Sequence, residues 1–131
     1  MALLQAREAA MLFFRPSLNR HGLTEQQWRV IRILHRQGAM ESRMLAEHAC
    51  ILKPSMTGVL NRMERDGLVF RRKAVHDQRR VFVELTAKGH GCFESMRDEV
   101  EADYRRLQEL FSEEKMNELL RLLNELRSVQ I

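Results

Sequence analysis

The sequence predicts a mainly α-helical fold with one small β-hairpin. Segments rich in Leu, Glu and Arg, with apolar residues three or four positions apart, fill most of the 131 residues. Only residues 68–74 and 80–85 combine β-prone side chains, and the second of these runs alternates apolar with polar positions. Two prolines and six glycines leave little room for disorder. We therefore expect a single folded domain of helices that contains one hairpin.

The N-terminal segment, residues 2–21, predicts a helix because its apolar residues recur at helical spacing. Pro16 is expected to kink or split this helix, since proline lacks the backbone N–H that the helical ladder needs. His21 and Gly22 then close it. The N-terminus lacks the basic lead-in and the small-residue cleavage site of a signal peptide, so we interpret it as structure.

Two further helices follow, separated by a short connection. The first begins with Thr24 as its N-cap and carries Gln27 three residues later, which is the capping-box pattern, and Gly38 ends it. The second, residues 41–49, is short. The apolar side chains that it is expected to present are Met44, Leu45 and Ala49.

The next helix follows a tight apolar connection, residues 50–52, and ends at Gly67. It opens at Pro54, because proline is tolerated at the first helical position, where its missing N–H would have no partner. Its apolar and polar residues separate onto two faces. The apolar face holds Met56, Leu60 and Met63, and the polar face holds Ser55, Thr57, Asn61, Arg62 and Arg65.

Two helices complete the chain after the hairpin. Thr86 caps a long helix, and Ser112 begins the last one, whose first two residues are acids that favour its positive end. Together with residues 2–21, these helices carry more apolar surface than a small core can cover alone. We expect this surface to join two copies of the chain, with an intramolecular bundle as the alternative.

Charge divides the sequence into a basic body and an acidic end. Residues 1–93 hold 16 Lys/Arg against 8 Asp/Glu, whereas residues 94–131 hold 6 against 10. The resulting net charges of +8 and −4 suggest a polyanionic partner for the first part only. An incidental imbalance would give the same totals unless the basic residues cluster in the fold.

Several classes of function find no support in the sequence. No apolar run approaches the roughly 20 residues of a membrane span. There is no glycine-rich phosphate loop, nucleophile elbow or His-Glu-x-x-His box, so we expect neither an enzyme nor a cofactor. The five histidines form no pair at i, i+4, which argues against a metal site. Two cysteines without metal-like spacing suit a reducing cytoplasm.

A winged helix-turn-helix layout emerges between residues 24 and 86: a short helix, a tight turn, a helix with a polar outer face, then a basic hairpin. Short polar side chains on such a helix suit base edges in a DNA major groove. Residues 71–80 hold five Lys/Arg and one Asp. Taken separately, each element has a plain alternative, a solvated helix face or a solvated turn. The candidate DNA contacts are Lys53, Ser55, Thr57, Asn61, Arg62, Arg65, Lys73, His76, Asp77, Arg79 and Arg80.

Three segments of the chain match a known pattern: "LTEQQWRVIRIL", "LKPSMTGVLNRMERDGLVFRR" and above all "DQRRVFVELTAKG". They resemble the MarR family of bacterial transcription regulators, and the resemblance covers essentially the whole chain. Within the family the chain is most similar to the HpaR-type regulators, which repress genes for homoprotocatechuate (4-hydroxyphenylacetate) degradation. The resemblance implies one domain over residues 1–131, with the winged helix-turn-helix at 24–86 and dimerisation helices at 1–22 and 87–131.

The resemblance also implies a homodimer whose N- and C-terminal helices intertwine and whose two winged parts read a palindromic operator in double-stranded DNA. Arg79 matches the wing arginine that enters the minor groove, where the negative potential of a narrow groove favours a guanidinium. Asp77 matches the acid that holds this arginine in place. Arg80, His76 and Lys73 are then expected to contact the DNA backbone.

The recognition helix departs from the family pattern at one position. Many relatives carry an arginine after the Ser-x-Thr-like triplet of this helix, whereas this chain has Gly58. An arginine–guanine contact is therefore not expected there. Base reading would instead depend on Ser55, Thr57 and Asn61.

An effector site is also implied, because members of this family release DNA when a small aromatic acid binds between the dimerisation helices and the winged part. Such a ligand needs a cation for its carboxylate and an apolar slot for its ring. Arg15 is the principal candidate for the cation, with the alternative that it extends from a helix end or pairs with an acid. The candidate ligand contacts are Phe14, Arg15, Arg20, His21, Trp28 and Ile33.

Two other functions remain open. Some relatives sense oxidants through a cysteine, and Cys50 lies just before the recognition helix, although a buried structural thiol is the plainer interpretation. Alternatively, the winged helix binds a protein rather than DNA. A protein-binding wing would not need Arg79, and its affinity would depend less on salt.

Overall fold

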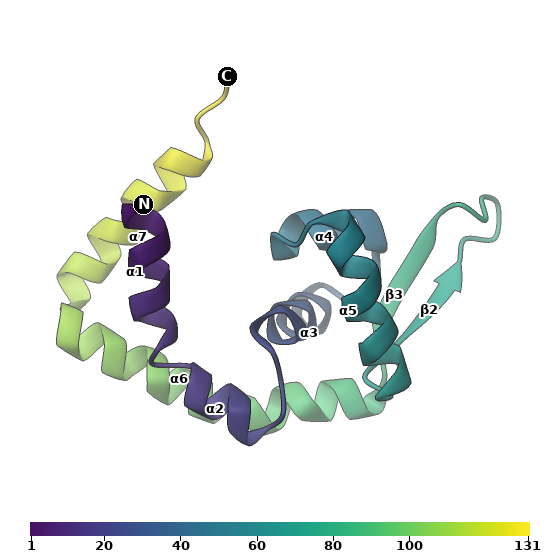
Figure 1. Cartoon of the computed structure of the whole chain (residues 1–131), viewed down its shortest axis with the longest axis horizontal. Helices are drawn as coiled ribbons and strands as arrows, with labels where there is room; N and C mark the ends of the chain where they lie inside the picture. Colours follow the sequence, from purple (N-terminus) through teal and green to yellow (C-terminus); the bar gives the residue numbers. More distant parts are fainter. The chain divides into compact units, whose positions relative to one another are not determined.

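The computed structural model describes residues 1–131 as seven helices and three strands (Figure 1). The helices are α1 (Ala2–Met11), α2 (Arg15–Arg20), α3 (Glu25–Gln37), α4 (Ser42–Ala49), α5 (Lys53–Arg65), α6 (Ala87–Phe111) and α7 (Glu113–Arg127). The strands are β1 (Met40–Glu41), β2 (Val69–Lys73) and β3 (Val81–Leu85). By its internal contacts the chain divides into two compact units, residues 17–97 and residues 1–16 with 98–131. The predicted fold class, mainly α with a small hairpin, is confirmed.

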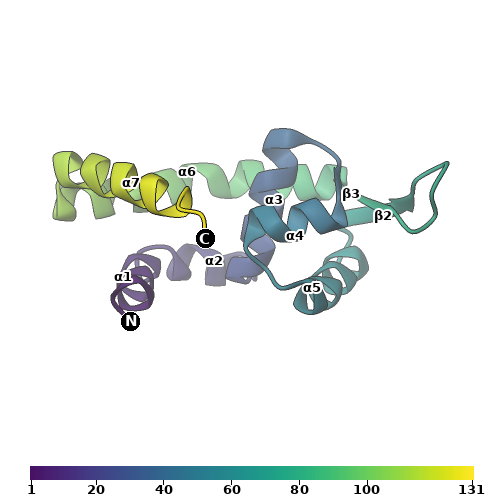
Figure 2. The ribbon, with the colours of Figure 1, turned by 90° about the horizontal axis from the view of Figure 1, so that it is seen from above.

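The three strands form one antiparallel sheet in the order β1-β3-β2. In the hairpin Val69 pairs with Leu85, and Lys73 pairs with Val81. This hairpin was predicted, but β1 was not, because a strand of two residues is too short to show an alternating pattern. Figure 2 shows the β2–β3 hairpin projecting beyond α4 and α5.

The core of the unit 17–97 lies where α3, α4 and α5 bury one face each near the sheet. The predicted apolar face of α5 is confirmed, since Met56, Leu60 and Met63 are all buried. Removing apolar surface of this kind from water contributes roughly 25 cal/mol per Å². The side chains at the centre of this core, each at most 1% exposed, are Val30, Ile31, Leu34, Leu45, Met63 and Val83.

Side-chain caps fix the starts of α3 and α6 as the sequence predicts. The backbone N–H of Gln27 donates to Thr24 Oγ1, and the backbone N–H of Thr24 donates to Gln27 Oε1, both at 3.1 Å, which completes a capping box. Thr86 Oγ1 accepts from the backbone N–H of Gly89 at 3.1 Å. The same hydroxyl donates to the carbonyl of Gly67 at 2.5 Å, so it also joins the end of the α5 segment to the start of α6.

The helix predicted over residues 2–21 is two helices, α1 and α2. The break precedes Pro16, because the backbone N–H groups of Phe13 and Phe14 donate three residues back and tighten the chain into a turn. Pro16 could not have continued the ladder, since it has no N–H to donate to the carbonyl of Leu12. It lies instead in the first turn of α2, where that N–H is not required.

Two smaller predictions for the central helices were wrong. Met44 is 49% exposed, because the buried face of α4 consists of Leu45, Ala46 and Ala49, and Met44 lies outside that stripe. Helix α5 begins one residue earlier than predicted, at Lys53, with Pro54 in its second position. Proline is accepted there for the reason given for the first position, since the first-turn N–H groups have no partner within the helix.

The second unit consists of α1, the C-terminal part of α6, and α7. Ser112 separates α6 from α7 with a φ of +97°, and its Oγ accepts from the backbone N–H of Lys115 at 3.0 Å, so it is the N-cap of α7. Arg106 lies over the ring of Phe13, 5.3 Å from its centroid. None of the seven helices combines the length and the apolar character needed to cross a membrane.

Candidate nucleic-acid interface

Helix α5 presents a polar outer face, as predicted. Its buried residues recur every three or four positions and leave the opposite face outside. Ser55, Thr57 and Asn61 are exposed there, with side chains short enough to reach base edges without folding back. Two exposed cations of the same helix, Arg62 and Arg65, lie nearer its C-terminal end, and a third, Lys53, is its first residue.

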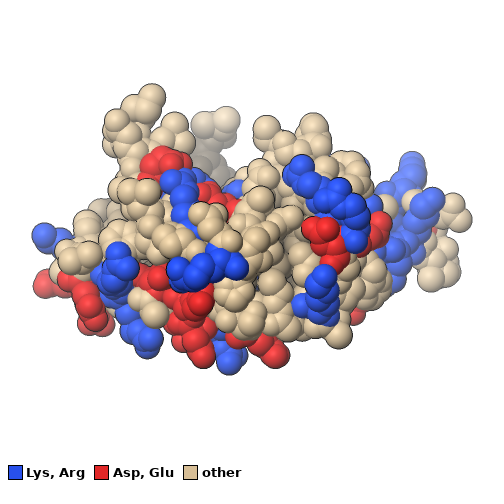
Figure 3. Space-filling view, turned by 60° about the horizontal axis from the view of Figure 1, so that its bottom comes forward, with Lys and Arg blue, Asp and Glu red and all other residues tan.

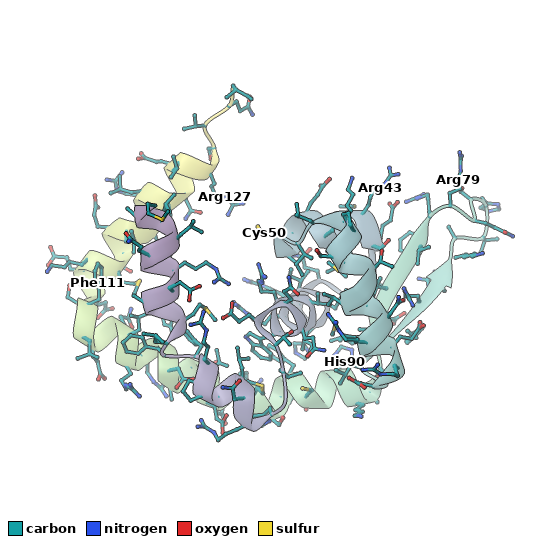
Figure 4. The ribbon with its side chains drawn as sticks, in the orientation of Figure 1. Arg43, Cys50, Arg79, His90, Phe111 and Arg127 are labelled. Carbon is teal, nitrogen blue, oxygen red and sulfur yellow. The ribbon has the colours of Figure 1, made fainter.

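The turn that joins α4 to α5 is built on a left-handed residue. Cys50 has a φ of +54°, and the backbone N–H of the next residue, Ile51, donates to the carbonyl of Ala46 at 3.0 Å, which is a Schellman-type ending. The thiol of Cys50 is exposed, so the interpretation of a buried structural cysteine was wrong (Figure 4). Ile51 is the residue of this turn that faces the core, where it is buried.

The tip of the hairpin is organised by Asp77. Its Oδ1 accepts from the backbone N–H of Arg79 at 3.0 Å and from Arg79 Nε at 3.3 Å. The backbone N–H of Arg80 also donates to the Asp77 carbonyl at 3.0 Å, which closes the turn. The Arg79 side chain is nevertheless 93% exposed and points away from the strands (Figure 4). The structure thus places the acid beside the arginine that the resemblance paired with it.

The remaining cations of the hairpin differ in how far their charge is neutralised. Arg80 pairs with Glu41 of β1 at 3.3 Å and lies over the Phe82 ring. Arg72 lies over the same ring, 5.2 Å from its centroid, and has no acidic partner. Lys73 and His76 are exposed. Lys and Arg side chains are visible on the projecting hairpin in Figure 3.

Besides Arg72 of the hairpin, two cations near this face are absent from the predicted DNA contacts, Arg43 on α4 and Arg71 on β2. Arg43 is exposed and labelled in Figure 4. Both line a hollow of about 300 Å³ that also includes Lys53 and Thr57. No pattern in the sequence could have found this group, because its members come from three separate elements.

Arg71 contacts two residues on the outer face of α5. Its Nη2 donates to Asn61 Oδ1 at 2.8 Å and to Glu64 Oε1 at 3.0 Å, and its Nε donates to Glu64 Oε2 at 3.3 Å. Hydrogen bonding to the Arg71 guanidinium lowers the pKa of the Glu64 carboxyl. Asn61 is therefore not a freely moving side chain on this surface.

A second cavity, of about 570 Å³, lies beside α3 in the same unit. Three arginines of α3 reach it from positions that share one helical face: Arg29, Arg32 and Arg36. Their spacing was visible in the sequence, but the sequence analysis did not use it. The rest of the lining is Ile33, His35, Gln37, His48 and Phe93.

Aromatic rings form one wall of this cavity. Phe93 stacks on His35 with 3.9 Å between ring centroids and on Trp28 with 5.6 Å. His35 Nδ1 lies 3.0 Å from His90 Nδ1, so one ring donates a hydrogen bond and the other accepts it. No group of three or more potential metal ligands is present in the structure.

The predicted effector residues belong to both units of the chain. Ile33 lines the α3 cavity, and the buried Trp28 stacks on Phe93, which also lines it. His21 lines a different cavity of about 470 Å³. Arg15 belongs to the other unit and pairs with Glu8 at 2.7 Å, the arrangement that its alternative interpretation describes. The remaining two candidates are Phe14, also in that unit, and Arg20, which donates to Ser17 Oγ at 3.1 Å.

Comparison with known proteins identifies relatives along the whole length of the chain. The sequence model of the MarR family matches residues 23–81. The homoprotocatechuate degradative operon repressor of Escherichia coli is 51% identical over 125 residues, which covers 95% of this chain and 84% of the repressor.

Two solved structures are similar to the whole fold. NadR in complex with 4-hydroxyphenylacetate is 48% identical and superposes with a TM-score of 0.83, covering 98% of this chain and 92% of NadR. The transcriptional repressor CouR, bound to a 23-mer DNA duplex, is 25% identical and superposes with a TM-score of 0.88, covering 96% of this chain and 89% of CouR.

Proposed function

Because the chain belongs to the MarR family, we propose that it is a dimeric repressor of an aromatic-acid catabolic operon, released from a palindromic operator by a small aromatic acid. The family and the relatives are transcription regulators, so the chain is a DNA-binding regulator and not an enzyme. The observation that carries the proposal is the pairing, in one unit, of a polar helix face with a hairpin whose tip arginine is held by an acid.

For DNA, we infer that α5 enters the major groove while the hairpin tip reaches the minor groove. Ser55 and Thr57 supply short hydrogen-bonding groups at the exposed start of α5. Arg79 extends from the tip with its guanidinium almost fully in solvent, as a side chain must if it is to enter a groove. Lys53 and Arg43 are suited to phosphates, because they lie together at one hollow outside the core.

For assembly, we propose that the unit 1–16 with 98–131 joins two copies of the chain. Its helices expose large apolar side chains, whose burial in a partner would remove them from water. Two-fold symmetry would then match a palindromic operator with half-sites about one helical turn apart. The exposed apolar residues of the helices of this unit include Leu3, Leu4, Leu110, Phe111, Leu119, Leu120, Leu122 and Leu126.

For the effector, we propose that the α3 cavity receives the aromatic acid. Arg32 and Arg36 offer guanidinium groups for a carboxylate, and the Phe93 ring offers a surface for the aromatic part of the ligand. 4-Hydroxyphenylacetate is the acid to test first, because NadR, a structural relative, is known in complex with it. Arg15 keeps its predicted role as a second candidate cation.

Salt dependence tests the DNA part of this proposal. We expect the logarithm of the affinity for duplex DNA to fall linearly with the logarithm of salt concentration, because Lys and Arg side chains displace counterions from phosphates. Fluorescence anisotropy with a labelled duplex, selected from a pool with a randomised centre, measures this slope. A chain that selects no duplex, or binds one with a flat salt response, would instead support a protein-binding winged helix.

Calorimetry with 4-hydroxyphenylacetate tests the effector part. We expect binding by the wild-type chain and a loss of roughly tenfold or more in affinity for Arg32→Ala, because a charge-assisted hydrogen bond contributes about 1.5–3 kcal/mol. Arg15→Ala distinguishes the two candidate cations, and Arg121→Ala, on α7, is the control. If the acid binds and no substitution in the α3 cavity weakens its binding, the effector site lies elsewhere. If no hydroxyphenylacetate binds, this class of acid is not the effector.

An oxidation-responsive regulator is the second candidate, and the exposure of Cys50 in the turn before α5 favours it. Oxidation of an exposed thiol there would add a polar group to the turn that sets the position of α5. If peroxide releases DNA from the wild-type chain but not from Cys50→Ser, this function is supported. Equal release from both would exclude a role for Cys50.

A further inference from the structure

The Arg71 side chain connects strand β2 of the hairpin to the recognition helix α5 by hydrogen bonds. Its guanidinium bonds Asn61 and Glu64, which lie three residues apart on the outer face of α5. The Arg71 side chain is only 26% exposed, whereas both of its partners are exposed. A guanidinium is planar and presents its donors in a fixed fork, so holding both partners at once restricts how each can turn.

The charge of Arg71 is directed toward Glu64 rather than toward a DNA phosphate. Glu64 takes two of its hydrogen bonds and neutralises it. Its neighbour Arg72 is different, because it is exposed and stacks on the Phe82 ring without an acidic partner. Successive residues of a strand point to opposite sides, so the two arginines have separate surroundings.

The contact determines which end of the Asn61 amide faces outward. Asparagine reads adenine with both ends, accepting from N6–H with its oxygen and donating to N7 with its nitrogen. Here the oxygen accepts from Arg71, at 2.8 Å, while the side chain as a whole is exposed. The amide nitrogen is attached to the other side of the same carbon, so it is the end left to meet a base.

We propose that Arg71 is a positioning residue for base recognition, which orients Asn61 so that its amide N–H groups face the major groove. Asn61 then prefers a base edge that accepts hydrogen bonds, such as guanine O6 or N7 or thymine O4, and disfavours the N4–H₂ donor of cytosine. This inference rests on the proposed function, specifically on α5 as the helix that enters the groove.

The proposal separates two kinds of arginine by their effect on binding. Arg71→Ala frees the amide to turn, so the preference at one base pair should flatten, with the best duplex losing about 3- to 10-fold in affinity. The salt slope should stay unchanged, because no phosphate contact is lost. Arg72→Ala is the matched control on the same strand, because Arg72 is an exposed cation without an acidic partner and is suited to a phosphate. It should weaken all duplexes evenly and reduce the salt slope by about one.

The experiment begins with a pool of duplexes randomised over the central base pairs, from which the wild-type chain selects its site. A panel of single base-pair changes in that site is then titrated at several salt concentrations with each variant. We expect Asn61→Ala and Arg71→Ala to reduce the sequence preference at the same base pair. The double variant should reduce this preference no further than either single variant does.

Two additional results keep the outcome clear. Arg71→Lys retains the charge and most of the aliphatic side chain but lacks the planar fork that holds both partners. It should therefore reduce the preference at the same base pair, and it provides this test even if Arg71→Ala fails to fold. The proposal is overturned if both Arg71 variants keep the wild-type base preference, or if Arg71→Ala behaves as Arg72→Ala does. A wild-type chain that selects no site would contradict the proposed function itself, and with it the premise of this inference.

Discussion

At the scale of single residues, Asp77 determines what Arg79 can offer to a partner. It accepts both the backbone N–H and the Nε of this arginine, so the side chain leaves the hairpin tip in a restricted set of directions. An exposed ion pair of this kind contributes little to stability, generally less than about 1 kcal/mol. The ion pair therefore matters for positioning Arg79 for binding and not for the stability of the fold.

Arg79→Ala should weaken operator binding by about 1–3 kcal/mol, because it removes a positioned groove contact. The measurement is a footprinting titration at fixed salt, with Arg121→Ala as the control. Arg121 is also an exposed arginine held by acids, but it lies on α7, outside the helix and hairpin proposed to contact DNA. Unchanged affinity for Arg79→Ala would remove the hairpin tip from the mechanism.

The two cysteines should differ in their reactivity. Burial raises the pKa of the Cys92 thiol, with nearby Lys88 opposing the shift, so less of the reactive thiolate is present at a given pH. Cys50 is exposed. We expect iodoacetamide to label Cys50 first at pH 8, because it is exposed, and the labelling of Cys92 to increase as the pH is raised. Mass spectrometry of quenched samples gives both rates, and faster labelling of Cys92 would contradict the burial described for it.

Contacts between distant residues were the part of the site that the sequence could not predict. His35 and His90 are 55 positions apart, so their contact at Nδ1 leaves no trace in any spacing rule. A pairing of Arg15 with an acid was anticipated as an alternative, and Glu8 is that acid, at 2.7 Å. Arg71 was missed because it is one of five similar cations in a basic hairpin, and its position in the sequence does not distinguish it from the other four.

At the scale of elements, the start of α6 depends on a glycine that has no room for a side chain. A Cβ at Gly89 would overlap the carbonyl oxygen of Leu68, which is backbone and cannot move aside, and would press on the Leu85 side chain. Two residues later in the same helix, a Cβ at Gly91 would meet nothing within 4 Å. The helix therefore contains two glycines with opposite requirements.

We expect Gly89→Ala to lower the free energy of unfolding by roughly 1–3 kcal/mol, as overpacking does. Gly91→Ala should raise it by about 1 kcal/mol, because alanine favours a helix over glycine by that amount. Urea denaturation at one protein concentration compares both with the wild type. Equal effects of the same sign would mean that the close approach of α6 to Leu68 is not tight.

Elements with capping signals were predicted accurately, and those defined by tertiary contacts were not. The Thr24 box and the Thr86 cap depend on residues next to the helix start, so local sequence contains the whole interaction. Strand β1 exists only because β3 lies beside it, and its two residues have no pattern of their own. Met44 was misplaced because the short helix α4 gave too few apolar positions to define its buried stripe.

At the scale of the whole molecule, the unit 1–16 with 98–131 leaves many leucines outside. Met116 is its buried apolar residue on α7, whereas Leu119, Leu120 and Leu126 on the same helix are exposed. Scattered surface leucines are ordinary, but several on one amphipathic helix form a continuous stripe. This is the arrangement that association of two copies would bury.

Leu126→Glu should shift the chain toward monomer, because it would place a charge in the proposed contact between copies. Light scattering after size-exclusion chromatography measures the mass without DNA. Val75→Glu is the control, since it changes an exposed apolar residue of the hairpin in the same way. A wild-type chain that is monomeric at micromolar concentration would exclude the dimer.

Arg29 connects the α3 cavity to the turn before α5, so it bears on the binding of both the aromatic acid and the operator. It lines the α3 cavity, and its Nη1 also donates to the carbonyl of Ala49, the last residue of α4 before the turn into α5, at 2.8 Å. For an acid that draws this guanidinium away from Ala49, thermodynamic linkage is reciprocal: the operator must weaken binding of the acid by the same factor as the acid weakens binding of the operator. Protein already seated on DNA would then need more inducer than free protein does, so the dose that opens the operon depends on how much of the repressor is bound.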